Sequence, residues 1–175
     1  LGPPAYTIVR KINQQVMLKK FTFVDPEAER MLKKYKEGNP ATRIRLLSHL
    51  VESRERNELL LSVVMELLNM EDGDERHILL LSERRQHLEN LSIMLREHNV
   101  ECGFYWGGEK QSKLDEAQKC KVILGTYNMA SEAMDIPTLN TMILSTPKSD
   151  IEQAVGRILR KVHDVTPILV DIFDQ

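Results

Sequence analysis

The segment HILLLSERRQHLENLSIMLREHNVECGFYWGG, residues 77–108, decides the fold of this chain. It begins with a short apolar run, His77–Leu81, which is typical of a buried strand. Residues 84–99 then place leucines on one stripe of an amphipathic helix, and Glu101–Trp106 is a second strand that ends at Gly107-Gly108. Short apolar strands that alternate with helices indicate a mostly parallel sheet with both faces covered. We therefore expect an α/β fold.

The same alternation continues to the end of the chain. The further strands expected are Lys121–Leu124, Thr141–Leu144 and Pro167–Phe173, and the further helices are Glu109–Gln118 and Ile151–Arg160. In such sheets ligands bind at the carboxyl ends of the strands. The expected fold is a three-layer α/β domain in which helices flank the sheet on both sides.

The first part of the chain has a different pattern. Tyr6–Ile12 and Val16–Val24 are β-rich, so they predict a hairpin or two short strands, and Pro26 begins a charged helix that ends near residue 36. Gly38-Asn39-Pro40 is a break, after which residues 42–70 have a helical pattern. We expect an N-terminal hairpin and helix extension over residues 1–40 and the main α/β domain over residues 41–175.

Composition narrows the class of protein. The 175 residues are 42% hydrophobic and 29% charged, as in an ordinary globular protein, and a net charge of −2 means that any nucleic-acid contact must be a local patch. The chain has two cysteines without metal-ligand spacing, and it has neither an apolar run of membrane-spanning length nor a signal peptide. We therefore expect an intracellular protein, cytoplasmic or nuclear, that contacts no membrane. A chain that begins with Leu1 reads as a fragment or a processed product.

Residues 151–160, IEQAVGRILR, carry the strongest functional pattern. One side of this expected helix has an amide, a glycine and two guanidiniums at offsets of three, four and seven: Gln153, Gly156, Arg157 and Arg160. The other side is apolar, and Ser149 with Glu152 forms a capping box at the start. Two rigidly held guanidiniums suit a polyanion. The alternative for an arbitrary arginine pair is a solvated helix face.

Polar or small residues end the first three strands of the α/β region. These ends are Ser82-Glu83-Arg84-Arg85, Gly107-Gly108 and Gly125-Thr126-Tyr127. Together such ends can follow a sugar–phosphate backbone, although each alone is also what a strand-to-helix turn requires. Trp106 could stack on a base, and the alternative is burial in the core.

Asp135 precedes Ile136-Pro137, and a residue near proline has a restricted backbone. A fixed carboxylate at this position could accept hydrogen bonds from ribose hydroxyls. The alternative interpretation is an aspartate that only begins a turn.

Taken in order, these segments resemble the second RecA-like lobe of superfamily-two helicases and translocases. Residues 78–85 resemble motif IV, residues 105–108 the aromatic–glycine turn, residues 124–137 motif V, and Gln153–Arg160 motif VI. Motif V lacks the glycine that many members carry before Asp135, and motif VI starts Glu-Gln rather than His-Arg, which points away from the DEAD-box branch. The combination is similar to helicases of phages and large cytoplasmic DNA viruses and to restriction translocases.

The resemblance implies a role for each motif residue. Arg157 and Arg160 would be arginine fingers on the ATP phosphates, and Gln153, Gly156 and Asp135 would contact the nucleotide. The residues implied in nucleic-acid binding are Ser82, Arg84, Gly107, Gly108, Thr126 and Tyr127.

The sequence has no G-x-x-x-x-G-K-[ST] phosphate loop. The resemblance implies that ATP and Mg are held mainly by an N-terminal RecA-like lobe of the same protein, so this part alone is expected to be inactive. The implied activity is that of an ATP-dependent helicase acting on single-stranded or duplex nucleic acid, DNA or RNA.

Two other functions fit the same residues less well. One is a non-catalytic α/β module that binds nucleic acid or protein, and the other is a small-molecule enzyme with an anion site at Arg157 and Arg160. The small-molecule enzyme lacks any recognisable nucleophile or dinucleotide motif.

Overall fold

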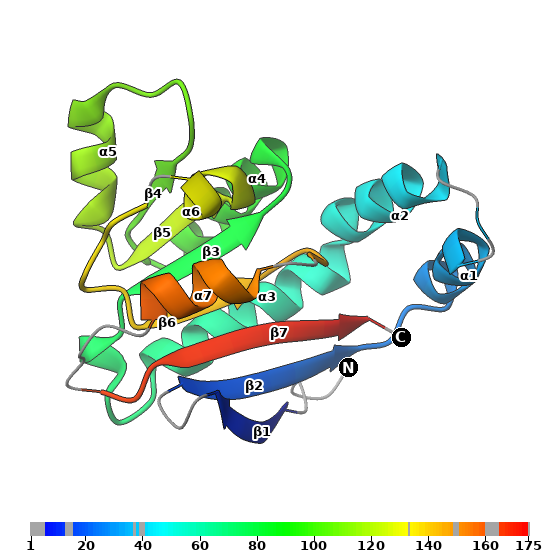
Figure 1. The fold of residues 1–175 in the computed structure, drawn as a ribbon, viewed down its shortest axis with the longest axis horizontal. Helices are drawn as coiled ribbons and strands as arrows, with labels where there is room; N and C mark the ends of the chain where they lie inside the picture. The colour runs from blue at the N-terminus through cyan, green and yellow to red at the C-terminus, as the bar shows by residue number, and fades with distance from the viewer. Residues whose placement is uncertain are drawn as a thin grey trace.

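The computed structural model describes residues 6–12, 16–36, 38, 41–132, 134–148, 151–159 and 165–174. Their core is a seven-stranded sheet with the order β1-β2-β7-β6-β3-β5-β4. Six strands, from β2 to β4 in that order, are parallel, and β1 lies antiparallel to β2 at one edge (Figure 1). The strands are β1 Tyr6–Ile12, β2 Val16–Phe23, β3 Ile78–Ser82, β4 Cys102–Tyr105, β5 Val122–Thr126, β6 Thr141–Leu144 and β7 Ile168–Asp174.

Helices cover both faces of the sheet, which confirms the predicted three-layer fold. They are α1 Pro26–Lys36, α2 Ala41–Glu52, α3 Arg54–Leu68, α4 Arg85–Glu97, α5 Gln111–Gln118, α6 Tyr127–Glu132 and α7 Glu152–Leu159, with a 3-10 turn at Gly73–Glu75. On one face, α3 and α4 pack against alternate strand residues such as Leu80 and Leu124. On the other face, α5, α6 and α7 pack against the intervening residues, such as Leu81 and Ile123.

The N-terminal strands belong to the main sheet. The register pair Ile12 and Val16 closes the predicted hairpin, and β2 then pairs along the whole of β7, from Met17 with Ile168 to Phe23 with Asp174. Helices α1 and α2 pack on each other and stand beyond the carboxyl ends of β2 and β7 (Figure 1). The division of the chain at residue 40 stays a prediction.

The helical pattern over residues 42–70 is divided between two helices. α2 ends at Glu52 and α3 begins at Arg54, with Ser53 as the N-cap whose hydroxyl accepts a hydrogen bond from the Arg56 amide at 3.2 Å. Hydrophobic periodicity alone missed this break, because apolar residues occur at helical spacing on both sides of it.

Arg56 ties α3 to the carboxyl ends of two strands. Its side chain is fully buried, and its Nε and Nη2 donate to the two carboxylate oxygens of Asp174 at 2.9 and 3.0 Å. Its Nη1 donates to the Ser145 carbonyl, immediately after β6. A fork–fork pair of this kind fixes geometry as well as charge. The arginine therefore sets the spacing between α3, β6 and β7 at this edge.

Arg76 makes a similar connection at the amino ends of the strands. It is buried, its Nε and Nη2 donate to the Asp72 carboxylate, and its Nη1 donates to the Thr166 carbonyl at 2.8 Å and the Thr141 hydroxyl at 3.3 Å. The Arg76 guanidinium, with burial acting against it, holds the pKa of Asp72 below its usual value. Each end of the sheet thus contains one carboxylate-paired, buried arginine.

A buried series of side-chain hydrogen bonds fixes the turn between β3 and α4. Asn57 Nδ2 donates to the Val51 carbonyl at 3.0 Å, which leaves Asn57 Oδ1 to accept from His87 Nε2 at 2.8 Å. His87 Nδ1 must then accept from the Ser82 hydroxyl at 2.9 Å, and Ser82 Oγ accepts the Arg84 amide at 3.1 Å. Burial, and after it the charge of Arg56, lowers the pKa of His87 to about 3, so the ring is neutral in the folded protein.

Removing the partner of Arg56 should destabilise the fold strongly. Asp174→Ala leaves a buried guanidinium without its counter-charge, and we expect a loss of about 3–5 kcal/mol in the free energy of unfolding, measured by urea denaturation. Glu58→Ala is the matched control, because it breaks the exposed Arg54–Glu58 pair and should cost less than about 1 kcal/mol. Equal losses in the two variants would contradict the role given to Arg56.

His87 should make stability depend on pH. The unfolded chain protonates this imidazole near its ordinary pKa of 6.5 but the folded protein does not, so the unfolded state binds more protons at acidic pH. The contribution is complete above pH 6.5 and is lost progressively as the pH falls toward 3. Between pH 7 and pH 5 it should cost about 2 kcal/mol.

Urea denaturation at a series of pH values tests this expectation. His87→Gln should flatten the pH dependence of unfolding in this range, whereas His98→Gln, at an exposed position, should leave it unchanged. An unaltered pH dependence in His87→Gln would show that the ring is not held neutral by the fold.

Candidate functional site

Three strand-to-helix turns lie side by side at the carboxyl edge of the sheet. Ser82 at the end of β3 is the register partner of Thr126 at the end of β5, and Gly125 is the partner of Tyr105 at the end of β4. The turns that precede α4, α5 and α6 therefore share one edge (Figure 1). This is the juxtaposition that the sequence predicted for the expected phosphate contacts.

The side chains of Ser82 and Tyr127 lie beneath this edge. Both are buried, and the Ser82 hydroxyl donates its hydrogen bond to His87. Tyr127 donates its hydroxyl to the Thr146 carbonyl at 2.6 Å, and burial raises its pKa. The sequence predicts a phosphate contact at Ser82. A direct contact by its hydroxyl would require the hydrogen bond to His87 to break. In the described arrangement both side chains fix the backbone of the turns.

The glycine turn after β4 has enough free space around it for a ligand to approach its backbone. A Cβ atom at Gly108 would have nothing within 4 Å, and at Gly107 it would approach only the Arg85 guanidinium, at 3.9 Å. Gly108 has φ +86°, a left-handed conformation that favours glycine, so the turn itself also demands this residue. Both interpretations of the pair, architecture and close approach to a ligand, agree with this geometry.

Two arginines at the start of α4 are held by neutral acceptors. Arg84 donates to the Ser48 hydroxyl at 2.9 Å and is within 3.5 Å of the Ile44 carbonyl, both on α2. Arg85 donates to the Gly107 carbonyl at 2.7 Å. Within the described part of the chain, neither arginine forms an ion pair with a carboxylate. Their side chains are therefore oriented while their positive charges stay available to an anion. Arg85 was not among the residues assigned from the sequence.

Arg157 on α7 is held in the same way. Its Nη2 donates to the last carbonyls of α6, Ala130 at 2.5 Å and Ser131 at 3.1 Å, and it has no carboxylate partner among the described residues. A cation at the carboxyl end of a helix is favourable, because the unpaired carbonyls there are partially negative. The side chain is exposed, so these contacts leave it open to solvent on one side.

The amphipathic pattern of α7 is confirmed. Its apolar residues, Ala154, Val155, Ile158 and Leu159, are buried in the core beneath the sheet face that α5 and α6 also cover. Gln153 is exposed beside Arg157, and Gly156 is buried. Arg160 and Ser149 lie outside the described residues, as does the side chain of Glu152.

Asp135 lies in the segment between α6 and β6. Asp135 is exposed and takes part in an interaction, and two residues, one of them outside the described part, separate it from the end of α6. The neighbouring Met134 and Ile136 are both buried, so the chain on either side of the carboxylate is anchored in the core. The proposed ribose contact stays a prediction.

Trp106 is buried next to the glycine turn, which is the second of the two interpretations of this residue. Its ring stacks on Phe104 with centroids 4.4 Å apart and an interplanar angle of 15°, and its Nε1 donates to Glu109 at 3.1 Å. The Arg85 guanidinium also lies over the ring, 5.1 Å from the centroid. A buried ring that already contacts Phe104 and Arg85 is not open to a base in this arrangement.

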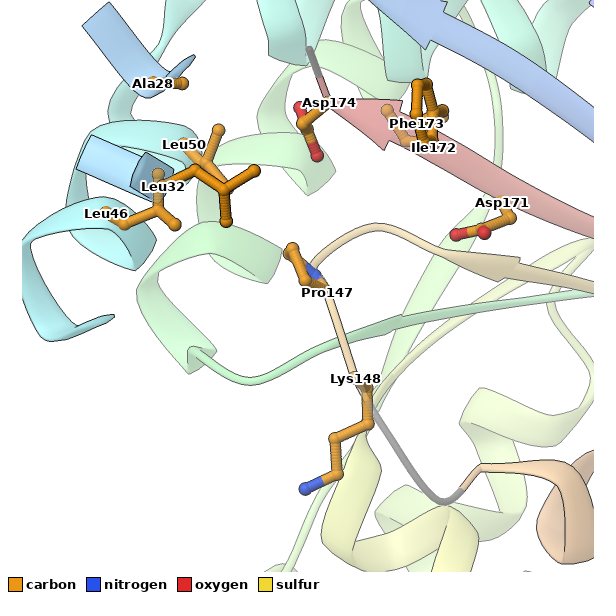
Figure 2. Close-up of a pocket in the computed structure, with 10 residues that line it drawn as sticks. All are labelled: Ala28, Leu32, Leu46, Leu50, Pro147, Lys148, Asp171, Ile172, Phe173 and Asp174. Carbon is orange, nitrogen blue, oxygen red and sulfur yellow. The ribbon is translucent and has the colours of Figure 1, made fainter. Parts of the chain in front are cut away.

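A hollow of about 280 Å³ lies elsewhere, between the α1–α2 pair and the ends of β6 and β7. Figure 2 shows apolar walls from helices α1 and α2, with Asp171 and Asp174 on the strand side and Lys148 extending away from the hollow. Burial raises the pKa of Asp171. Two carboxyl groups suit a phosphate poorly, and no residue assigned from the sequence lines this hollow.

Two negative findings apply to the described residues alone. No group of three or more histidine, cysteine, aspartate or glutamate side chains is arranged to hold a metal ion. None of the described helices combines the length and the apolar composition that crossing a bilayer requires.

Comparison with known proteins agrees with the motif pattern. The family described as the helicase conserved C-terminal domain matches residues 55–162. A protein of Acanthamoeba polyphaga mimivirus, named as an ATP-dependent RNA helicase, is 37% identical over 180 residues, which is 99% of this chain and 34% of that protein. The chain thus spans about a third of the length of this relative.

Solved structures share the fold at low identity. The SWI2/SNF2 ATPase core domain of Sulfolobus solfataricus superposes with a TM-score of 0.65 at 13% identity, over 90% of this chain and 39% of that one. The same core in complex with double-stranded DNA gives a TM-score of 0.53 at 14% identity, over 91% and 41%. UvsW of T4 gives 0.65 at 15% identity, over 91% and 32%. The family match and the relative together show that this chain belongs to the helicase conserved C-terminal domain family of superfamily two, with a RecA-like fold.

Proposed function

We propose that this chain is the C-terminal motor lobe of an ATP-dependent nucleic-acid helicase or translocase. In this role it supplies arginine fingers to ATP and forms part of a groove for a nucleic-acid strand. One observation carries the proposal: Arg84, Arg85 and Arg157 are oriented by neutral acceptors, and none of the three forms an ion pair with a carboxylate among the described residues. The mimivirus relative, named as an RNA helicase, and the Sulfolobus core, solved with double-stranded DNA, support a nucleic-acid substrate without deciding between RNA and DNA.

The nucleotide side of the proposal rests on α7. Arg157 is exposed and charged, and its present acceptors are two carbonyl oxygens that phosphate oxygens can replace. Arg160, one helical turn further on, would be the second finger, with Gln153, Gly156 and Asp135 nearer the rest of the nucleotide. A guanidinium on the transferring phosphoryl group stabilises the charge that develops there.

ATP and Mg would be bound mainly by an N-terminal RecA-like lobe of the same protein. This chain would contact the phosphates of that nucleotide through arginine, with Arg157 as the candidate that the structure describes.

The nucleic-acid side consists of the three adjacent turns. Arg84 and the open glycines Gly107 and Gly108 would contact phosphates, Thr126 would contact them beside α6, and Ser82 and Tyr127 would hold the turns from beneath. Contacts of this kind follow a backbone and carry no sequence preference.

The short helix α6 gives a physical link between the two sides. It begins at Tyr127, directly after Thr126, and its last carbonyls are the acceptors of Arg157. When Arg157 exchanges these carbonyls for phosphate oxygens, the carboxyl end of α6 loses its cation, and the helix that carries the strand contact is free to shift. Nucleotide and strand thus bias the same element, which is what coupling between two sites requires.

The finger assignment predicts a specific kinetic defect. In the protein that carries this chain, Arg157→Ala should lower strand-stimulated ATP hydrolysis by about 10³-fold or more, because the group acts on the transition state. ATP affinity should change only a few-fold. The measurement is steady-state hydrolysis with saturating single-stranded nucleic acid, together with ATP binding at equilibrium.

Arg30→Ala is the matched control, since Arg30 is an exposed arginine whose ion-pair partner among the described residues is Glu27 of its own helix. It should leave hydrolysis unchanged. Full turnover by Arg157→Ala would refute the role of Arg157 as a finger.

A further inference from the structure

Two arginines of α4 lie against a stacked pair of aromatic rings, Phe104 of β4 and Trp106 just after it. Arg96 lies 5.8 Å from the centroid of Phe104, Phe104 stacks on Trp106 at 4.4 Å, and Arg85 lies 5.1 Å from the centroid of Trp106. Both arginines come from α4, one from its first residue and one from its last turn. These contacts therefore run along α4 and reach the carboxyl edge at Arg85 only.

Arg85 is restrained twice at this edge. The indole face attracts the guanidinium through its negative quadrupole, and the Gly107 carbonyl accepts one of its N–H groups at 2.7 Å. Trp106 is itself fixed, because it is buried, stacked on Phe104 and hydrogen-bonded to Glu109. An exposed arginine held in this way loses less conformational freedom when it binds an anion.

We infer that Arg85 binds a phosphate of the nucleic-acid strand and that Trp106 is the positioning residue that holds it there. The inference rests on the proposed function and deepens it. Three observations support it: Arg85 begins α4 beside the open glycine turn, the Gly107 bond leaves its other donors free to bond elsewhere, and no carboxylate neutralises it among the described residues. The competing explanation is that the contact only stabilises the turn.

The first experiment measures binding of a fluorescently labelled single-stranded oligonucleotide to the 175-residue chain by anisotropy, over a range of salt concentrations. Arg85→Ala should weaken binding about three- to tenfold at low salt. It should also lower the slope of log K against log salt by about 0.7, the value for one phosphate contact on a single strand. Arg96→Ala, at the far end of α4, is the matched control and should change neither quantity.

The second experiment uses Trp106 itself, because it is the only tryptophan of the chain. When Arg85 engages a phosphate, its contact with the indole changes, so oligonucleotide binding should change the tryptophan fluorescence. In Arg85→Ala this response should vanish at oligonucleotide concentrations that saturate the variant. A role for Trp106 in folding alone would leave the response unaltered.

Variants of Trp106 complete the test. Trp106→Leu should weaken binding about two- to fivefold, the amount that an exposed cation–π contact contributes, and Trp106→Phe should recover part of the loss because it keeps a ring. Unfolding curves check that both variants are folded. The inference is wrong if Arg85→Ala binds the oligonucleotide as well as the wild-type chain does and the tryptophan fluorescence of the wild-type chain does not change on binding. If neither the wild-type chain nor the protein that carries it binds the oligonucleotide even at low salt, the proposed function itself fails.

Discussion

The parallel direction of six neighbouring strands is the constraint on which the rest of this structure depends. Strands that all run one way must be joined by crossovers, so helices cover both faces and every carboxyl end arrives at one edge. Residues that are far apart in the sequence, such as Ser82 and Thr126, become register partners there. The candidate site is a consequence of this direction, because no single segment contains enough of it to bind a strand or a nucleotide.

Five arginines of the chain fall into two groups according to the kind of acceptor that holds them. Arg56 and Arg76 are buried and join elements at the two ends of the sheet. Their charges are neutralised there by the carboxylates with which they pair. Arg84, Arg85 and Arg157 are held by carbonyls, a hydroxyl and a ring, which orient a guanidinium without neutralising it. The first kind stabilises the fold, and the second kind suits an exchange of protein oxygens for phosphate oxygens.

Local patterns predicted most of the fold, and the motif pattern named candidate site residues whose roles stay predictions. Hydrophobic periodicity depends only on residues close together in the sequence. It predicted the strand at β3, the amphipathic stripe of α4 and the two faces of α7. Pairing of β2 with β7 and the burial of Arg56 were not predictable, because their partners lie more than 100 residues away. The motif pattern named Ser82 but could not show that its hydroxyl is used internally. It included Arg85 in a strand end without a role of its own, because the partner of Arg85, Trp106, comes from another strand end.

The central claim is that Arg84, Arg85 and Arg157, which neutral acceptors hold, bind phosphate. The most direct measurement is NMR of the guanidinium Nε–H resonances of these arginines in the protein that carries this chain, during titration with ATP and with a single-stranded oligonucleotide. The account predicts that Arg157 responds to ATP, that Arg84 and Arg85 respond to the oligonucleotide, and that Arg56 and Arg76 respond to neither. Unchanged Arg84, Arg85 and Arg157 resonances at saturating ligand, or shifts confined to the carboxylate-paired arginines, would contradict it.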